Sequence, residues 1–247
     1  MCRWQQEQAF NMIDGNQVLV VVPARGGSKG VKLKNLRTVG GVPLVARVGH
    51  LLSELPWVDR AVVSTDNTEI ARVATESGLE APFMRPDTLS GDRIGDLEVL
   101  VNALEEMEGI DAVTYDIIVM LQPTSPLRTA DHVTSTLRKL IDENWDSVWT
   151  VSETDSKSHP LKQLTISDET EALDYYDPNG GQVIARQQLG KLYHRNGAAY
   201  AIRRDCLLEQ GTIKGARTGA LVMDGEFVSI DTEWDFRLVD FILASSS

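Results

Sequence analysis

The stretch "VLVVVPARGGSKGVKLKNL", residues 18–36, begins as an apolar run and continues into a glycine-rich loop that carries positive charge. A continuous β-branched run of this length is typical of a strand covered on both faces, as in a parallel sheet. The whole chain has a net charge of −12, yet residues 25–37 contain no acidic residue and five cations: Arg25, Lys29, Lys32, Lys34 and Arg37. The stretch therefore predicts a buried first strand whose carboxyl end leads into an anion-binding loop.

Similar apolar runs recur along the chain, and segments with helical spacing separate them. Runs of strand length lie at residues 61–64, 117–121 and 147–151, and apolar residues with helical spacing lie within 44–55, 70–74, 97–107 and 133–141. Strands that alternate with helices predict right-handed βαβ units. We therefore expect a three-layer, Rossmann-like α/β fold in which helices cover both faces of a mostly parallel sheet.

The length and composition are those of an ordinary globular protein. A chain of 247 residues, 42% hydrophobic and 24% charged, can bury a substantial core. We expect residues 1–16 to form a flexible N-terminal extension and residues 17–247 to form the main domain. From about 152 to 193 the sequence is polar, with Pro160, Pro178 and paired glycines, which predicts an inserted arm. The α/β pattern then resumes and closes with a helix at about 233–243.

Composition also excludes several classes of protein. No apolar run approaches the roughly 20 residues that span a bilayer, and the first residues lack the apolar core of a signal peptide. Two cysteines, Cys2 and Cys206, are too few for a disulfide framework and favour a reducing compartment. The negative net charge argues against nucleic acid or an anionic membrane as a partner. We expect a cytoplasmic protein whose basic loop binds a small molecule.

The basic loop has the chemistry of a polyphosphate site. It follows the carboxyl end of the first strand, and ligands of open α/β sheets usually bind outside the carboxyl ends of the strands. Gly26 and Gly27 can turn backbone N–H groups toward an anion, Arg25 offers a two-pronged donor, and Lys29 and Lys34 are point charges. The spacing matches neither the dinucleotide fingerprint nor the P-loop. A tight turn followed by a solvated basic face is the alternative interpretation.

Two later segments place polar side chains after predicted strands. In "VVSTDN", residues 62–67, we expect Thr65 or Asp66 to cap the following helix. "LQPTSPLR", residues 121–128, presents the amide of Gln122, which suits a sugar hydroxyl, and Thr129 or Asp131 would cap the next helix.

The last such segment, "FVSIDTEWDF", spans residues 227–236 and is interpreted as a strand that ends at Asp231 and leads into a helix. An aspartate beside phosphates is a natural Mg²⁺ ligand. Asp235, one helical turn further on, is expected to be structural.

Several segments, in this order, resemble the acylneuraminate cytidylyltransferase family, whose members couple sialic and related sugar acids to CMP. The segments are "PARGGSKGVKLKNL", "VVSTDN", "LQPTSPLRTADHV", "RQQL", "RNGAAYAI" and "SIDTEWDF", and the resemblance covers nearly all of residues 18–243. It implies a nucleotidyltransferase fold, with transfer of CMP from CTP to the anomeric hydroxyl of a nonulosonic acid and release of pyrophosphate. It further implies Mg²⁺ as cofactor and a homodimer in which the arm reaches the neighbouring site.

The resemblance also assigns roles to individual residues. Catalysis is implied for Arg25, Lys34 and Asp231, and Asp231 is the implied metal ligand. Nucleotide contacts are implied for Ala24, Arg25, Gly26, Ser28, Lys29, Lys34, Asn35, Arg85 and Ser90. Sugar contacts are implied for Gln122, Lys162, Arg186, Gln187 and Asn196, with Lys162 supplied by the neighbouring subunit. Without the resemblance, Arg85 and the arm would be interpreted as solvated, and Asn196-Gly197 as a plain turn.

The sequence departs from the family's pattern at one position and leaves two rival functions open. The family often has two aspartates spaced Asp-x-Asp, whereas this chain has Ser229-Ile230-Asp231. One rival is a cytidylyltransferase for another keto sugar acid such as 3-deoxy-manno-octulosonate, whose family lacks "LQPTSPLR". The other is a non-catalytic nucleotide-binding homologue. Sialic, legionaminic and pseudaminic acids differ by groups that only the shape of the pocket discriminates.

Overall fold

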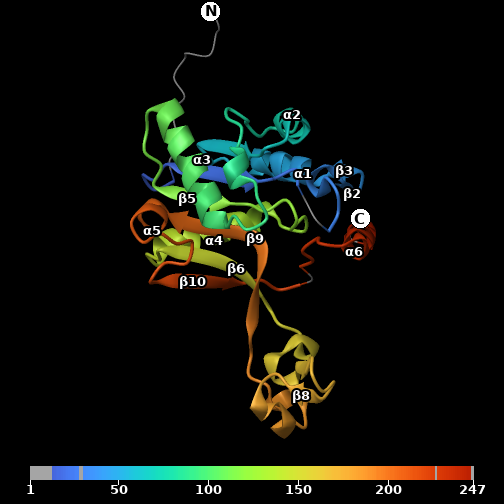
Figure 1. Ribbon diagram of the computed structural model, residues 1–247. Coiled ribbons are helices and arrows are strands. Elements are labelled where there is room, and N and C mark those ends of the chain that lie inside the picture. Colours follow the sequence, from blue (N-terminus) through green and yellow to red (C-terminus); the bar gives the residue numbers. More distant parts are fainter. Residues whose placement is uncertain (1–12, 28–29, 226, 246–247) are drawn as a thin grey trace, which may run out of the picture.

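The computed structural model describes residues 13–27, 30–225 and 227–245, and its main part is a six-stranded sheet (Figure 1). The strand order is β10-β6-β9-β5-β1-β4. Strand β9 runs antiparallel to both of its neighbours, and the other pairs are parallel. The strands are β1 (Val18–Pro23), β4 (Arg60–Ser64), β5 (Ile117–Met120), β6 (Ser147–Glu153), β9 (Tyr193–Arg203) and β10 (Thr218–Val222).

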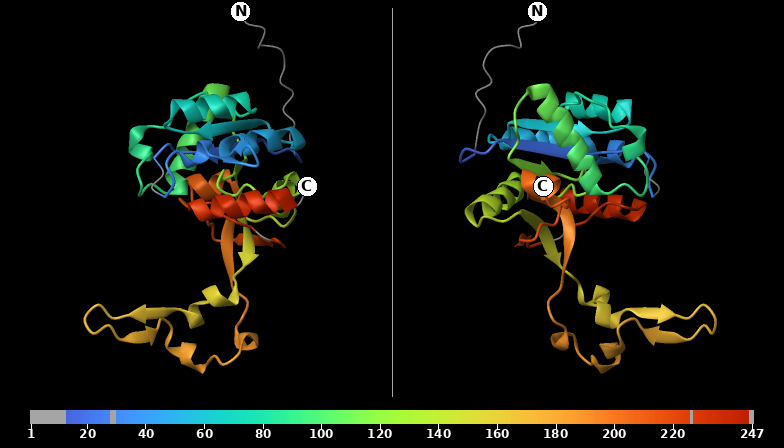
Figure 2. Two further views of the ribbon diagram at one scale, coloured as in Figure 1. Left: turned by 90° about the vertical axis from the view of Figure 1, so that its right-hand side faces the viewer. Right: turned by 60° about the vertical axis from the view of Figure 1, so that its left-hand side comes forward.

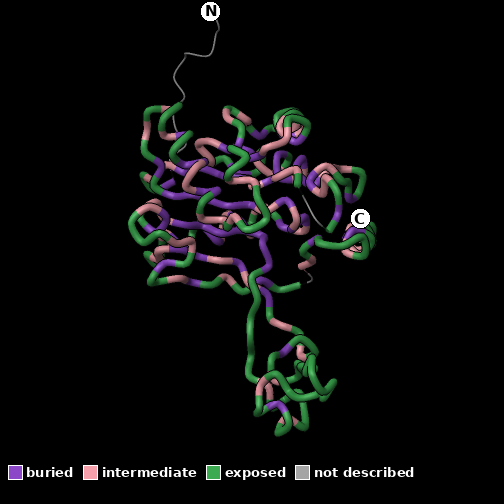
Figure 3. The backbone as a smooth tube through the Cα atoms, viewed as in Figure 1, coloured by how far each residue is buried: buried purple, intermediate pink, exposed green. Residues whose placement is uncertain are grey.

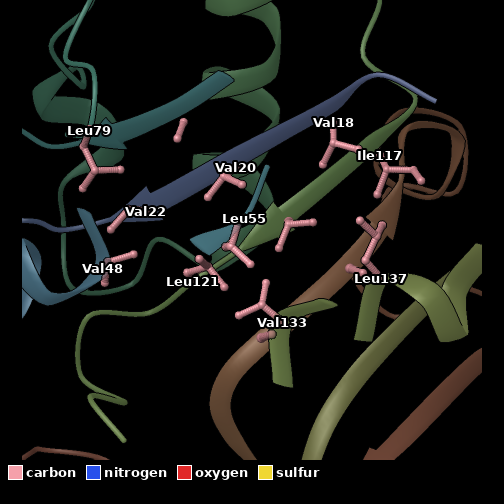
Figure 4. Packing of buried hydrophobic residues seen from close by; sticks show 14 of the residues in the cluster. Val18, Val20, Val22, Val48, Leu55, Leu79, Ile117, Leu121, Val133 and Leu137 are labelled. Atoms are coloured by element: carbon pink, nitrogen blue, oxygen red, sulfur yellow. The ribbon is translucent and has the colours of Figure 1, made fainter. Parts of the chain in front are cut away.

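Helices cover both faces of this sheet. One face packs against α1 (Leu44–Leu51), α2 (Thr68–Glu76) and α4 (Ala130–Asp142), and the other against α3 (Asp96–Asp111) and α5 (Arg204–Leu208). Figure 4 shows alternate side chains of β1 meeting residues of α1 and α4 on the first face. Residues 18–22 are fully buried because strand β1 lies inside the sheet under both layers. The predicted three-layer α/β fold is confirmed.

Short elements complete the sheet domain. Phe236 and Val239 of α6 (Glu233–Ser245) pack with Val31, Val39 and Ile230 in a third apolar cluster. The remaining elements here are the hairpin β2 (Thr38–Val39) and β3 (Val42–Pro43) and the 3-10 turns η1 (Lys34–Leu36), η2 (Leu52–Glu54) and η3 (Asp87–Leu89). None of the helices in the described ranges has the length and apolarity needed to cross a membrane.

Of the two helix caps predicted from the sequence, one is confirmed and one is wrong. Thr129 caps α4 as expected, accepting a hydrogen bond from the backbone N–H of His132. For α2 the prediction was wrong, because the cap is Asn67, whose Oδ1 accepts from Glu69 N and Ile70 N. Asp66 instead accepts a hydrogen bond from Gly26 N at 2.7 Å, since the loops after the adjacent parallel strands β1 and β4 face each other.

The strand predicted to end at Asp231 does not form. The described residues just before Asp231 cross the carboxyl edge of the sheet, where Ile230 N donates to Thr124 O at 2.8 Å and the Ile230 side chain is fully buried. The apolar pattern thus serves packing under α6 rather than strand pairing. Asp235 is structural, as expected, because its carboxylate accepts hydrogen bonds from Asp231 N, Thr232 N and Thr232 Oγ1.

Between β6 and β9 the chain leaves the sheet domain as an arm. Both views of Figure 2 show the arm projecting from the sheet domain, and Figure 3 shows that most of its residues are exposed. It consists of the hairpin β7 (Leu164–Ile166) and β8 (Leu173–Tyr175) and the 3-10 turns η4 (Ser156–Ser158), η5 (Pro160–Lys162), η6 (Pro178–Gln182) and η7 (Arg186–Gln188). At the other end of the domain, Ile13 is buried in the core, so packing begins before the predicted boundary at residue 17.

Candidate active site

A cleft of about 720 Å³ opens at the carboxyl edge of the sheet. Its walls come from the loops after β1 and β5, from the segment beside β4, from the start of α3 and from the first half of β9. Seven of the predicted site residues line it: Arg25, Lys34, Asn35, Arg85, Gln122, Asn196 and Asp231. Below, the part around Arg25, Lys34 and Asp231 is called the basic end, and the part around Gln122, Arg195 and Asn196 is called the β9 end.

Lys34 and Asp231 are paired at the basic end. Lys34 Nζ donates to Asp231 Oδ1 at 2.8 Å and to the carbonyl oxygen of Ile230 at 2.7 Å. A Cβ atom at Gly30 would lie 2.5 Å from the carbonyl oxygen of Asp231, so only glycine allows the basic loop to approach this closely. The structure therefore brings together two of the three residues that were predicted to be catalytic.

Arg25 lies at the rim of the same end. Its Nη1 donates to Asp92 Oδ1 at 2.8 Å, and its carbonyl oxygen accepts from Asn35 Nδ2 at 3.1 Å. Asn35 is buried and so fixes the loop from below. The Arg25–Asp92 pair is partly exposed, and such pairs contribute only about 0–1 kcal/mol, so a polyanion can replace Asp92 as the partner of Arg25.

Arg85 is buried in the wall beside β4, which rules out the interpretation that it is a solvated loop residue. Its side chain is held by Ser64, through Nε to Oγ at 3.0 Å and through Nη2 to the carbonyl oxygen at 2.5 Å. Burial lowers its pKa to about 10, while the charges of Asp66 and Asp96 act in the opposite direction. Arg85 stays protonated at neutral pH and lines the cleft as a cation whose position is fixed by Ser64.

The loop that carries Gln122 packs tightly against Asn196 and Gly197, which lie within strand β9 at an irregularity of its pairing with β6, so the interpretation of these two residues as a plain turn was wrong. Gly197 has a φ of +74°, and a Cβ atom there would lie 2.6 Å from Gln122 Oε1 and 2.5 Å from Ser125 Oγ. Arg128 Nη2 donates to the carbonyl oxygens of Gln122 and Gly197. Burial lowers the pKa of Arg128 to about 9. Sequence reasoning assigned no role to Arg128, the last residue of "LQPTSPLR".

Asn196 is buried and anchors this irregular part of β9. Its Oδ1 accepts from Thr150 Oγ1 at 2.7 Å and from Ala198 N at 3.1 Å, and its Nδ2 donates to Ser152 Oγ at 3.0 Å. These bonds account for its place in the strand. Its predicted contact with a sugar stays a prediction.

Three other cleft residues were missed by sequence reasoning: Asp96, Arg195 and Tyr200. Asp96 begins α3, and burial raises the pKa of its carboxyl while the charges of Arg195 and Arg85 oppose the shift. Tyr200 is buried on β9, and burial raises its pKa as well. Arg195 directly precedes Asn196 and is the first residue of the quoted segment "RNGAAYAI", but nothing in that segment shows that its side chain lines the cleft.

Other predicted residues lie outside this lining. Ser28 and Lys29 fall outside the described residues. Ala24 is buried and Gly26 is held by Asp66, while the Ser90 hydroxyl donates to the carbonyl oxygen of Pro86 at 3.1 Å. Three more residues belong to the arm and do not line the cleft of their own subunit: Lys162, Arg186 and Gln187.

Known proteins similar in sequence to this chain include enzymes named for the synthesis of CMP-linked nonulosonic acids. The chain is 29% identical over 229 residues to a CMP-N,N'-diacetyllegionaminic acid synthase of Campylobacter jejuni, covering 92% of this chain and 95% of that protein. It is 30% identical over 221 residues to an N-acylneuraminate cytidylyltransferase of Streptococcus agalactiae, covering 88% of this chain and 51% of the relative.

Structural comparison gives the same fold. A solved CMP:2-keto-3-deoxy-manno-octonic acid synthetase complexed with CTP superposes with a TM-score of 0.67 at 20% identity, covering 94% of this chain and all of that one. A sequence profile described as cytidylyltransferase matches residues 19–234. These matches confirm the resemblance drawn from the motifs. The chain belongs to the cytidylyltransferase family and is a nucleotidyltransferase.

Proposed function

We propose that this protein transfers CMP from CTP to the anomeric hydroxyl of a nonulosonic acid and releases pyrophosphate. The observation that carries the proposal is the arrangement of the cleft, in which Lys34 and Arg25 form a basic end and Gln122 lies toward β9. The relatives reported above are named for CMP-linked nonulosonic acids, and they match this chain over most of its length.

The basic end binds the triphosphate in this proposal. Arg25 and Lys34 neutralise the phosphate oxygens and the charge that develops on the leaving pyrophosphate. The anomeric oxygen forms a bond to the α-phosphorus while the bond from that phosphorus to the bridging oxygen breaks, and a phosphate oxygen accepts the hydroxyl proton. Positioning and charge neutralisation supply most of the rate enhancement.

The wall beside β4 suits a cytosine base. Cytosine presents an exocyclic amino donor beside ring acceptors. Arg85 supplies donors from a buried, fixed position, and the carboxylate of Asp96 supplies an acceptor in the same cleft. This pair of complementary groups supports CTP as the nucleotide and predicts that uracil, which has a carbonyl where cytosine has an amino group, binds less well.

The donor set at the basic end fits a Mg²⁺ ion that is bound together with a polyphosphate. Within the described ranges no three His, Cys, Asp or Glu side chains form a metal cluster, but Asp231 and Ser229 both line the cleft. Mg²⁺ commonly uses one or two carboxylates plus substrate phosphates and waters. Asp231 would hold the ion, with Ser229 as a weaker oxygen donor, and the ion would neutralise phosphate charge.

The arm supports a homodimer. Its exposed apolar side chains include Ile184 at 92% and Ile166 at 67% exposure, and a two-stranded hairpin alone is only marginally stable in water. A second copy of the chain would cover these residues, and Lys162 would then reach the neighbouring cleft.

The cytoplasm is the proposed location of the protein, because its few cysteines suggest a reducing compartment.

The proposed function is tested by incubating the protein with Mg²⁺, a nucleotide and one acid at a time, and measuring pyrophosphate. The acids are N-acetylneuraminic, legionaminic, pseudaminic and 3-deoxy-manno-octulosonic acid, and the nucleotides are CTP and UTP. We expect release with CTP and at least one nonulosonic acid. Release only with the octulosonic acid, or CTP binding without any release, would overturn the proposal.

A further inference from the structure

The geometry points to Arg195 as the residue that binds the carboxylate of the acceptor acid within the cleft of its own subunit. Arg195 opens the segment "RNGAAYAI", which carries part of the family resemblance, but no contact with a substrate was assigned to it. The inference rests on the proposed function, because it names how the acid is recognised at that same site.

Arg195 is an available cation at the β9 end. It lies in β9 opposite Val151, directly before the anchored Asn196, and lines the cleft together with Gln122 and Gly197. Its side chain is exposed, and among the described residues no hydrogen bond or ion pair engages its guanidinium. Its charge acts on Asp96 and on Tyr200. A guanidinium in this position can form two parallel hydrogen bonds to a carboxylate.

The local charge balance favours an anionic ligand. Asp96 interacts with both Arg195 and Arg85, and its partial burial works against its ionised form. Among the residues that line the cleft, Asp96 is thus the one carboxylate beside the guanidiniums of Arg195 and Arg85. Over the whole lining, Arg25, Lys34, Arg85 and Arg195 outnumber the carboxylates of Asp96 and Asp231, although the chain carries a net charge of −12. CTP accounts for the cations at the basic end and leaves Arg195 for a second anion.

The position of Arg195 fits the acid rather than the triphosphate. Strand β5 separates β9 from β1, whose loop forms the basic end, and two strand spacings amount to about 10 Å. Gln122, which was predicted to bind the sugar, follows β5 between them. Arg186, which the resemblance implies as a sugar contact, lies in the arm outside this lining. Arg195 is thus placed across the predicted sugar position from the phosphates.

The test measures acid binding directly, by calorimetry in the presence of a CTP analogue with a methylene bridge between the α- and β-phosphates. The acid that binds most tightly to the wild type is compared with its carboxamide analogue. Arg195→Gln should weaken binding of the acid by about 10- to 100-fold, as expected for a charged hydrogen bond, and abolish its preference over the carboxamide. The affinity for the CTP analogue alone should change less than about twofold.

Two comparison variants make the result decisive. Arg195→Lys keeps the charge and should keep part of the preference for the acid, which separates charge recognition from misfolding. Arg186→Gln should retain the preference. The inference is overturned if Arg195→Gln binds the acid and the carboxamide as the wild type does, or if Arg186→Gln alone loses the discrimination. A wild type that binds the acid but releases no pyrophosphate from CTP would instead contradict the proposed function.

Discussion

Lys34 and Asp231 form an ion pair of 2.8 Å across the basic end of the cleft, although they lie 197 positions apart in the chain. The Asp231 side chain is 75% exposed, whereas that of Lys34 is 15% exposed. A pair with such an exposed partner contributes only about 0–1 kcal/mol to stability. The pair therefore contributes little to the fold, and a polyphosphate can draw Lys34 away and leave the carboxylate available.

Asp231→Asn should lower metal-dependent turnover strongly while leaving the fold intact. The amide is a much weaker Mg²⁺ ligand than the carboxylate, so the Mg²⁺ concentration needed for half-maximal pyrophosphate release should rise about tenfold or more. Thermal unfolding should be almost unchanged, because the side chain is mostly exposed. Asp131→Asn, an exposed substitution on α4, is the matched control. An unchanged Mg²⁺ requirement in Asp231→Asn would show that the metal assignment is wrong.

Gly30→Ala should reduce turnover by displacing the segment that carries Asp231. The added Cβ atom would lie 2.5 Å from the carbonyl oxygen of Asp231, and a backbone contact of this kind cannot be relieved by a side-chain rotation. Gly109→Ala places the same methyl group in open space on α3 and should leave turnover unchanged. Equal turnover in both variants would mean that the close approach of the loop to Asp231 is not needed.

Asp96→Asn should weaken the discrimination between CTP and UTP. An ionised carboxylate only accepts hydrogen bonds, whereas an amide can also donate to the carbonyl group of uracil. The ratio of kcat/KM for the two nucleotides should fall by about tenfold. A control at Glu105, an exposed carboxylate further along α3, should keep the wild-type ratio when changed to Gln. A ratio that is also unchanged in Asp96→Asn would remove Asp96 from base recognition.

Mixing inactive Lys162→Ala and Arg25→Ala subunits should restore activity if the arm completes the neighbouring site. In a twofold dimer assembled at random, half of the molecules are mixed and one site in each has both intact residues, so about a quarter of wild-type activity should return. The measurement is pyrophosphate release after the two variants are unfolded and refolded together. Each variant refolded alone is the control. No gain over the controls would rule out a shared site.

The sheet and the basic loop were predictable because their signals are local. The unbroken apolar run of β1 requires cover on both faces, and the cations after it have no acidic neighbours in sequence. The same holds for the cap at Thr129, where the partner lies three residues away. Such features depend on periodicity and on neighbours in the chain, which a sequence displays directly.

The predictions that were wrong or missing concern residues whose contacts in the fold are distant in sequence. Asp66 was expected to cap α2, but its carboxylate bonds to Gly26 from the adjacent strand's loop. The apolar residues before Asp231 suggested a strand, but Ile230 packs beneath α6 instead. Arg195 gained its place in the cleft from the antiparallel course of β9, a topology that no spacing of residues indicates.

The most direct test of the proposed function is the yield of CMP-linked acid and pyrophosphate from CTP in the wild type, Arg25→Ala and Arg37→Ala. Arg37 belongs to the same basic stretch but pairs with Glu233 away from the cleft lining. With a nonulosonic acid, the wild type should form one CMP-linked acid for each pyrophosphate. Arg37→Ala should do so as fast as the wild type. Arg25→Ala should be slower by about 100-fold or more, as for the loss of a group that stabilises developing charge. Near-normal turnover in Arg25→Ala, or no CMP-linked acid from the wild type with any nonulosonic acid, would contradict the account.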